Sequence, residues 1–151
     1  MKIDFWQLLK ATSRTFYLSI RSLPRGMDES LGLAYLMLRV SDYLEDSGSL
    51  PPEEKIRLLH LWRKVIRGEV PAEELERQIR ENPDPAEVDY QAAAAAGGIL
   101  DLVHDLPTGV GRSIAQHVEA ATLGMARWVG RGPDIETEDD LDDYMHESPE
   151  E

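Results

Sequence analysis

Apolar residues recur every three or four positions along most of the chain, and this period predicts an all-α protein. The clearest case is the segment from about Met27 to Ser47, between the helix breakers Pro24, Gly26 and Gly48. Its apolar residues fall on one side of a helix: Leu33, Leu36, Met37, Val40 and Leu44. This side is expected to pack against the core.

Further helices are predicted on both sides of this segment. Residues 4–23 fit a helical pattern that is interrupted near Thr12 and Ser13, where a hydroxyl can cap a second helical segment. Later helices are expected from Pro51–Pro52 onward and over residues 72–80, 86–105 and 111–129. The run 106–113 has neither the length nor the lysine of a phosphate-binding loop and is interpreted as a turn between helices. Core candidates in the first segment are Phe5, Leu8, Leu9, Phe16 and Ile20.

Small residues dominate the segment Ala92–Gly98. Two interpretations are open for it. Small side chains permit close packing of helices, and they also leave room for a slender ligand channel.

The other side of the 27–47 helix is polar. Tyr35, Arg39, Asp42 and Asp46 lie within about 60° of one another around the axis, with Glu45 on the flank. Asp42 and Asp46 are one turn apart and suit Mg²⁺, which takes oxygen ligands and is often completed by substrate phosphate. Arg39 precedes Asp42 by one turn and can bind the same phosphate through two parallel hydrogen bonds. This face therefore predicts a site for diphosphate and magnesium.

A solvated acidic face is the alternative interpretation. The chain contains 29 acidic residues among 151, so a short acidic string also arises from composition alone. Arg39 would then serve as the ion-pair partner of Asp42.

Composition narrows the classes of function. A net charge of −13 argues against nucleic acid and favours metal cations and basic partners. The absence of cysteine excludes disulfides and thiolate metal sites. The sequence shows neither a secretory signal nor a run of about 18 apolar residues, so a cytoplasmic location is expected, with peripheral membrane contact left open.

Two motifs resemble those of the squalene/phytoene synthase family, which is all-helical. They occur in the family's order, with Leu23-Pro24 between them: Ser13-Arg14-Thr15-Phe16 and Tyr35-x-x-x-Arg39-x-x-Asp42-x-x-Glu45-Asp46. The ending Glu45-Asp46 is closer to the squalene synthase branch, and Tyr43 stands where other branches have a second aspartate.

The resemblance continues over residues 120–128 and 136–146, but the family's second aspartate-rich motif is missing from this sequence. Residues 1–151 are therefore expected to form one truncated helical domain, the N-terminal part of an isoprenoid-synthase-type bundle. Self-association, or a partner that supplies the remaining helices, is expected to cover its apolar surface.

The resemblance implies head-to-head condensation of two prenyl diphosphates, from farnesyl diphosphate to presqualene diphosphate and squalene. Mg²⁺ is the implied cofactor, and NADPH is implied only for a complete squalene-forming enzyme. The implied metal ligands are Asp42, Glu45 and Asp46, and Tyr144 is the implied catalytic residue. The implied substrate-binding residues are Ser13, Arg14, Phe16, Tyr35 and Arg39.

With one carboxylate cluster, the chain alone is expected to be weakly active or inactive. Two other functions stay open. One is a phytoene synthase-type enzyme acting on geranylgeranyl diphosphate, and the other is a non-catalytic helical interaction module.

Overall fold

The structure is a computed structural model that describes residues 3–131, and all regular secondary structure in that range is helical. The all-α prediction is confirmed. The helices of this range are α1 (Phe5–Thr12), α2 (Arg14–Arg21), α3 (Met27–Asp46), α4 (Pro52–Ile66), α5 (Ala72–Glu81), α6 (Tyr90–Ala94), α7 (Ala96–His104) and α8 (Thr108–Arg131).

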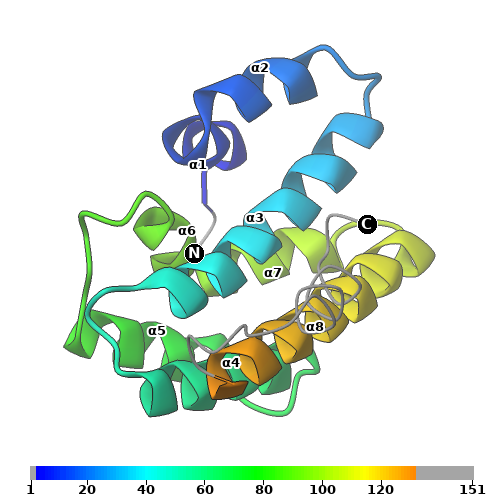
Figure 1. The fold of residues 1–151 in the computed structure, drawn as a ribbon. Helices are drawn as coiled ribbons and strands as arrows, with labels where there is room; N and C mark the ends of the chain where they lie inside the picture. Colours follow the sequence, from blue (N-terminus) through cyan, green and yellow to red (C-terminus); the bar gives the residue numbers. More distant parts are fainter. Residues whose placement is uncertain (1–2, 132–151) are drawn as a thin grey trace, which may run out of the picture.

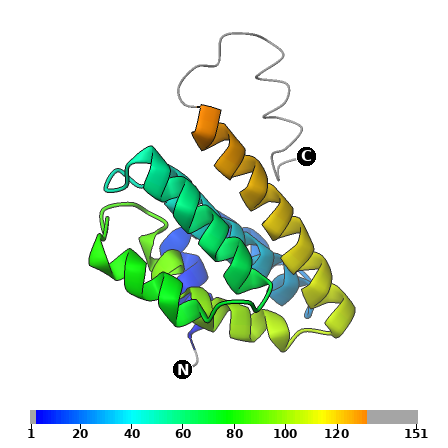
Figure 2. The same cartoon turned by 90° about the horizontal axis from the view of Figure 1, so that it is seen from below.

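Helix α3 forms the centre of the molecule (Figure 1), because it packs against α4, α6, α7 and α8. Helix α2 adjoins the N-terminal half of α3, and α1 lies between α2 and α6. Helices α4 and α8 lie side by side and run in opposite directions (Figure 2). The predicted apolar side of α3 is buried as expected: Leu33, Leu36, Met37, Val40 and Leu44. No helix between residues 3 and 131 has the length and hydrophobicity needed to cross a membrane.

A buried polar contact joins α3 to α4 and α8. The indole N–H of Trp62 donates to the hydroxyl of Ser41 at 3.0 Å, and the hydroxyls of Ser41 and Thr122 are 2.7 Å apart. Thr122 also donates to the carbonyl of Val118 at 2.7 Å. These hydrogen bonds satisfy side chains that would otherwise be buried without partners, and they fix how the three helices face one another.

The break between α1 and α2 is at Ser13, as the sequence predicted. Its backbone is extended, with φ −157° and ψ 111°, and its hydroxyl accepts the N–H of Phe16 at 3.2 Å. One residue thus ends α1 and caps α2.

The prediction of one helix over residues 86–105 is wrong. The chain forms turns as far as Asp89, then α6, and it breaks at Ala95 before α7. Tertiary contacts hold the turns in place: the N–H of Asp84 donates to the Tyr43 hydroxyl at 3.0 Å, and its carboxylate accepts the N–H of Gly48 at 2.9 Å. These contacts outweigh the helix propensity of the following residues.

The prediction of a turn over residues 106–113 is also too long. The connection ends at Pro107, whose carbonyl accepts the N–H groups of Val110 and Gly111 at 2.9 and 3.0 Å. Pro107 therefore immediately precedes α8, at a helix start where a missing N–H costs nothing.

The glycines of α7 lie close to neighbouring side chains. A Cβ on Gly98 would clash with the side chain of Ile3, and a Cβ on Gly97 would lie 3.1 Å from a carboxylate oxygen of Glu76. Close packing therefore accounts for these two glycines, while Ala94, Ala95, Gly97 and Gly98 also line a pocket, so both interpretations of the segment stay open.

Candidate functional site

The two sequence motifs meet at an aromatic contact between α2 and α3. The ring of Phe16 stacks on that of Tyr35, with centroids 3.9 Å apart and planes 12° from parallel. The guanidinium of Arg39, one turn along α3, lies 4.8 Å from the centroid of the Tyr35 ring. Such a cation over an aromatic face is attracted by the ring quadrupole.

Arg39 is shared between two carboxylates. Its Nη1 is 3.2 Å from Oδ2 of Asp42 on α3 and 3.4 Å from Oδ2 of Asp89, which directly precedes α6. Burial lowers the pKa of Arg39, but the attraction of Asp42, Tyr35 and Asp89 outweighs it and raises the pKa above its ordinary value. Burial raises the pKa of Asp89, and Arg39 opposes that increase. The attraction between the two side chains thus offsets part of the cost of burying them.

At the C-terminal end of α3, the carboxylates of Asp42, Glu45 and Asp46 repel one another. Burial raises the pKa of Glu45 to about 7, with further contributions from the carboxylates of Asp46 and Asp42, while Lys55 on α4 opposes the increase. Asp46 is exposed, and Asp42 and Glu45 are half-buried. A cation placed between these side chains would relieve their repulsion.

The donor chemistry of this end fits Mg²⁺. No group of three or more histidine, aspartate or glutamate side chains converges on one metal position in the described residues. Mg²⁺ does not need such a group, since it usually binds one or two carboxylates and completes its shell with water and substrate phosphate. Asp42, Glu45 and Asp46 as metal ligands stay a prediction.

The remaining predicted site residues lie in different settings. The Ser13 hydroxyl is engaged in capping α2, and Arg14 is exposed at the first position of that helix. Tyr144 lies outside the described residues. Of the predicted set, the structure brings together Phe16, Tyr35, Arg39 and Asp42.

Sequence reasoning missed Asp89. It is 50 positions from Arg39 in the chain, in a segment that the sequence pattern assigned to a helix. An aspartate at a helix start usually indicates a cap, and here its side chain makes no capping hydrogen bond. Only the folded backbone shows that it faces Arg39.

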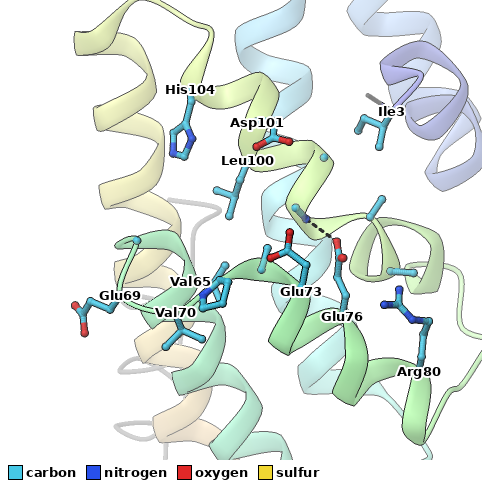
Figure 3. Close-up of a pocket in the computed structure, with 17 residues that line it drawn as sticks. Ile3, Val65, Glu69, Val70, Glu73, Glu76, Arg80, Leu100, Asp101 and His104 are labelled. Carbon is cyan, nitrogen blue, oxygen red and sulfur yellow. Dashed lines mark hydrogen bonds between the residues drawn. The ribbon is translucent and has the colours of Figure 1, made fainter. Parts of the chain in front are cut away.

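A separate pocket of about 780 Å³ lies between the start of α5 and α7 (Figure 3). Within it, a carboxylate oxygen of Glu76 accepts the N–H of Gly97 at 2.8 Å. None of the predicted site residues lines it, and its charges would repel a diphosphate. Four carboxylates and one guanidinium line it: Glu69, Glu73, Glu76, Asp101 and Arg80.

A family profile described as squalene/phytoene synthase matches residues 9–149. The chain belongs to the squalene/phytoene synthase family. Both motifs that meet at the stack of Phe16 on Tyr35 fall within the matched range.

Squalene synthases from several organisms are similar to this chain. The one from Schizosaccharomyces pombe is 30% identical over 146 residues, which cover 93% of this chain and 30% of the relative. The squalene synthase from Solanum lycopersicum is 27% identical, and the match covers 92% of this chain and 31% of the relative. The human squalene synthase is 26% identical, and the match covers 75% of this chain and 28% of the relative. The chain thus spans about 30% of the length of these relatives.

A solved structure of TcSQS in complex with a ligand, BPH1237, superposes with a TM-score of 0.72. The match covers 95% of this chain and 39% of that one, at 22% identity. This likeness shows that the helices of the described residues have the squalene synthase fold.

Proposed function

We propose that this chain forms the diphosphate-binding wall of a squalene synthase-type prenyltransferase that joins two prenyl diphosphates head to head. The observation that carries the proposal is the convergence of Phe16, Tyr35, Arg39 and Asp42, which places an aromatic surface, a guanidinium and a carboxylate side by side. A prenyl diphosphate has matching parts: an apolar chain, an anionic head group and metal ions bound to that head group.

Each side chain has a role in this proposal. Arg39 donates charge-assisted hydrogen bonds to diphosphate oxygens and stabilises the negative charge that develops as the allylic C–O bond breaks. Phe16 and Tyr35 line the start of the prenyl chain and exclude water from the allylic cation. Mg²⁺ bound at Asp42 and Asp46, with Glu45 binding directly or through water, would neutralise the leaving diphosphate.

Farnesyl diphosphate is the proposed substrate, because this chain is similar to squalene synthases from Schizosaccharomyces pombe, Solanum lycopersicum and human. NADPH use in a squalene-forming reaction, and a role for Tyr144, stay predictions. Geranylgeranyl diphosphate, the substrate of a phytoene synthase-type enzyme, is the competing choice.

Binding of thiodiphosphate analogues tests the proposal without requiring turnover. We expect calorimetry to show Mg²⁺-dependent binding of farnesyl thiodiphosphate, with a weaker response for the geranylgeranyl analogue. Asp42→Asn removes a charged metal ligand at constant shape and should weaken binding by at least about tenfold. Asp101→Asn, on the exposed side of α7, is the matched control and should bind like the wild type.

Two results would contradict the proposal. Binding that is independent of Mg²⁺ and unchanged in Asp42→Asn would show that the polar face of α3 is only solvated. Absence of any binding would favour a helical interaction module. Tighter binding of the geranylgeranyl analogue would correct the substrate and leave the site in place.

A further inference from the structure

Asp89 is a buried carboxylate that does not act as a helix cap. It occupies the N-cap position of α6, yet its side chain accepts no hydrogen bond from the backbone of that helix. Its Oδ2 instead lies 3.4 Å from Nη1 of Arg39, and the side chain is only 3% exposed. Burying an ionised carboxylate is unfavourable unless it is paired, so the position requires an explanation in terms of Arg39.

The backbone around Asp89 is attached to α3 on both sides. Upstream, the N–H of Asp84 donates to the hydroxyl of Tyr43 at 3.0 Å. Downstream, the ring of Tyr90 packs edge-on against that of Tyr43, with centroids 5.7 Å apart. Tyr43 is one turn beyond Arg39 on the same helix and is 1% exposed. Asp89 is therefore held at a fixed position relative to Arg39.

The pairing between the two side chains is incomplete. In the described part of the chain, Nε of Arg39 and Oδ1 of Asp89 are both buried and lack a hydrogen-bond partner. One nitrogen, Nη1, serves both Asp42 at 3.2 Å and Asp89 at 3.4 Å. Charge-assisted hydrogen bonds are usually about 2.7 to 2.9 Å long, so neither contact is optimal. A parallel two-pronged pair between Arg39 and Asp89 would give both unpaired atoms a partner.

We propose that Asp89 is a positioning residue for Arg39. When Asp42 binds metal, Arg39 gives up its ion pair with Asp42 and pairs with Asp89 instead. The guanidinium turns from its shared position into a two-pronged pair with Asp89. This releases the Asp42 carboxylate from Arg39, so that Asp42 can bind the metal, and leaves the outer N–H groups of Arg39 for the diphosphate. The inference rests on the proposed function, because it requires a metal ion at Asp42.

Asp42 and Asp89 differ in solvent exposure, so they suit different roles. The Asp42 side chain is 25% exposed and accessible to a hydrated cation, whereas Asp89 at 3% is not. Without Asp89, Arg39 would keep Asp42 as its counter-ion, and its positive charge would repel a cation there. Asp89 neutralises that charge from the buried side.

The test uses the full chain with Mg²⁺ and inorganic pyrophosphate as probes. The quantity measured is the Mg²⁺ concentration at which pyrophosphate binding is half-maximal. We expect Asp89→Asn to raise this concentration by about tenfold or more, since Arg39 then competes for Asp42. Asp89→Glu, which keeps the charge, should restore most of the wild-type value.

Glu119→Gln is the matched control. Glu119 of α8 also makes ion pairs between segments, with Arg63 of α4 and with Arg67, which directly follows α4, both at 3.0 Å. Its loss destabilises the fold, but the half-maximal Mg²⁺ concentration should stay at the wild-type value. A purely structural role for Asp89 would give the same result as this control and would overturn the inference.

A second measurement uses only wild-type protein. Nuclear magnetic resonance of the Arg39 Nε–H, assigned by comparison with Arg39→Lys, should show slower exchange with water after addition of Mg²⁺ and pyrophosphate, because the group gains an acceptor. If the protein binds Mg²⁺ and pyrophosphate but the exchange of the Arg39 Nε–H is unchanged, the role of Asp89 is overturned and the proposed function still stands. Failure of the wild type to bind Mg²⁺ and pyrophosphate would overturn the proposed function together with it.

Discussion

Glu45 should make the stability of this protein depend on pH. Burial and the carboxylates of Asp46 and Asp42 raise its pKa from 4.5 to about 7 in the folded state. Between these two pH values, the folded chain holds a proton that the unfolded chain has released. Because the folded state binds more protons there, the free energy of unfolding falls as the pH rises through this interval.

The size of the effect follows from the separation of the two pKa values. At about 1.4 kcal/mol per pH unit, the separation corresponds to at most about 3.5 kcal/mol. Glu45 is partly exposed, and solvent screening reduces the expected effect to about 1 to 2 kcal/mol. Glu45→Gln removes the ionisable group at nearly constant shape. This variant should match the wild type at acid pH and be more stable by that amount at about pH 8.

Urea unfolding followed by far-UV circular dichroism, at several values between about pH 5 and pH 8, measures this difference. Groups distant from Glu45 contribute equally to both proteins, so the difference reports the ionisation of Glu45 together with its coupling to Asp42 and Asp46. Asp101→Asn controls for the loss of one exposed negative charge and should show no comparable trend. The difference in free energy of unfolding between the two proteins could be independent of pH, or it could favour the wild type as the pH rises. Either result would refute the explanation that burial and neighbouring carboxylates raise the pKa of Glu45.

Two further predictions concern packing and hydrogen bonding. A Cβ on Gly111 would lie 2.8 Å from the carbonyl oxygen of Val103, so Gly111→Ala should destabilise the fold by about 1 to 3 kcal/mol in thermal unfolding. At Gly109 a Cβ meets nothing within 4 Å, and Gly109→Ala should be neutral or stabilising by up to about 1 kcal/mol. Trp62→Phe should lose about 1 to 3 kcal/mol, because the Ser41 hydroxyl loses its indole donor. In urea unfolding, adding Ser41→Ala should then cost less than Ser41→Ala alone, and additive losses would contradict this coupling.

Some features could be predicted because they depend on neighbours in the chain. The helical period of the 27–47 segment assigned its buried and polar sides correctly, since a helix brings residues three and four apart onto one face. Ser13 was predicted to interrupt the first helix because its hydroxyl can cap the next turn, and it does so. The two motifs also indicated the family, which the match over residues 9–149 confirms.

Other features depend on which segments meet after folding. The sequence assigned residues 86–105 to one helix because it contains no information on how Tyr43 holds the backbone of Asp84. The contact of Asp89 with Arg39 spans 50 positions and follows no period.

The sequence alone therefore determined the all-α class, the central helix with its apolar side, and the residues that carry the family resemblance, because these are properties of local spacing. Only the tertiary structure decided that Phe16 stacks on Tyr35, that Ser41 joins three helices and that Arg39 is shared between Asp42 and Asp89. Such contacts arise when packing encloses polar groups, and each enclosed group must then take its partner from whichever segment lies beside it.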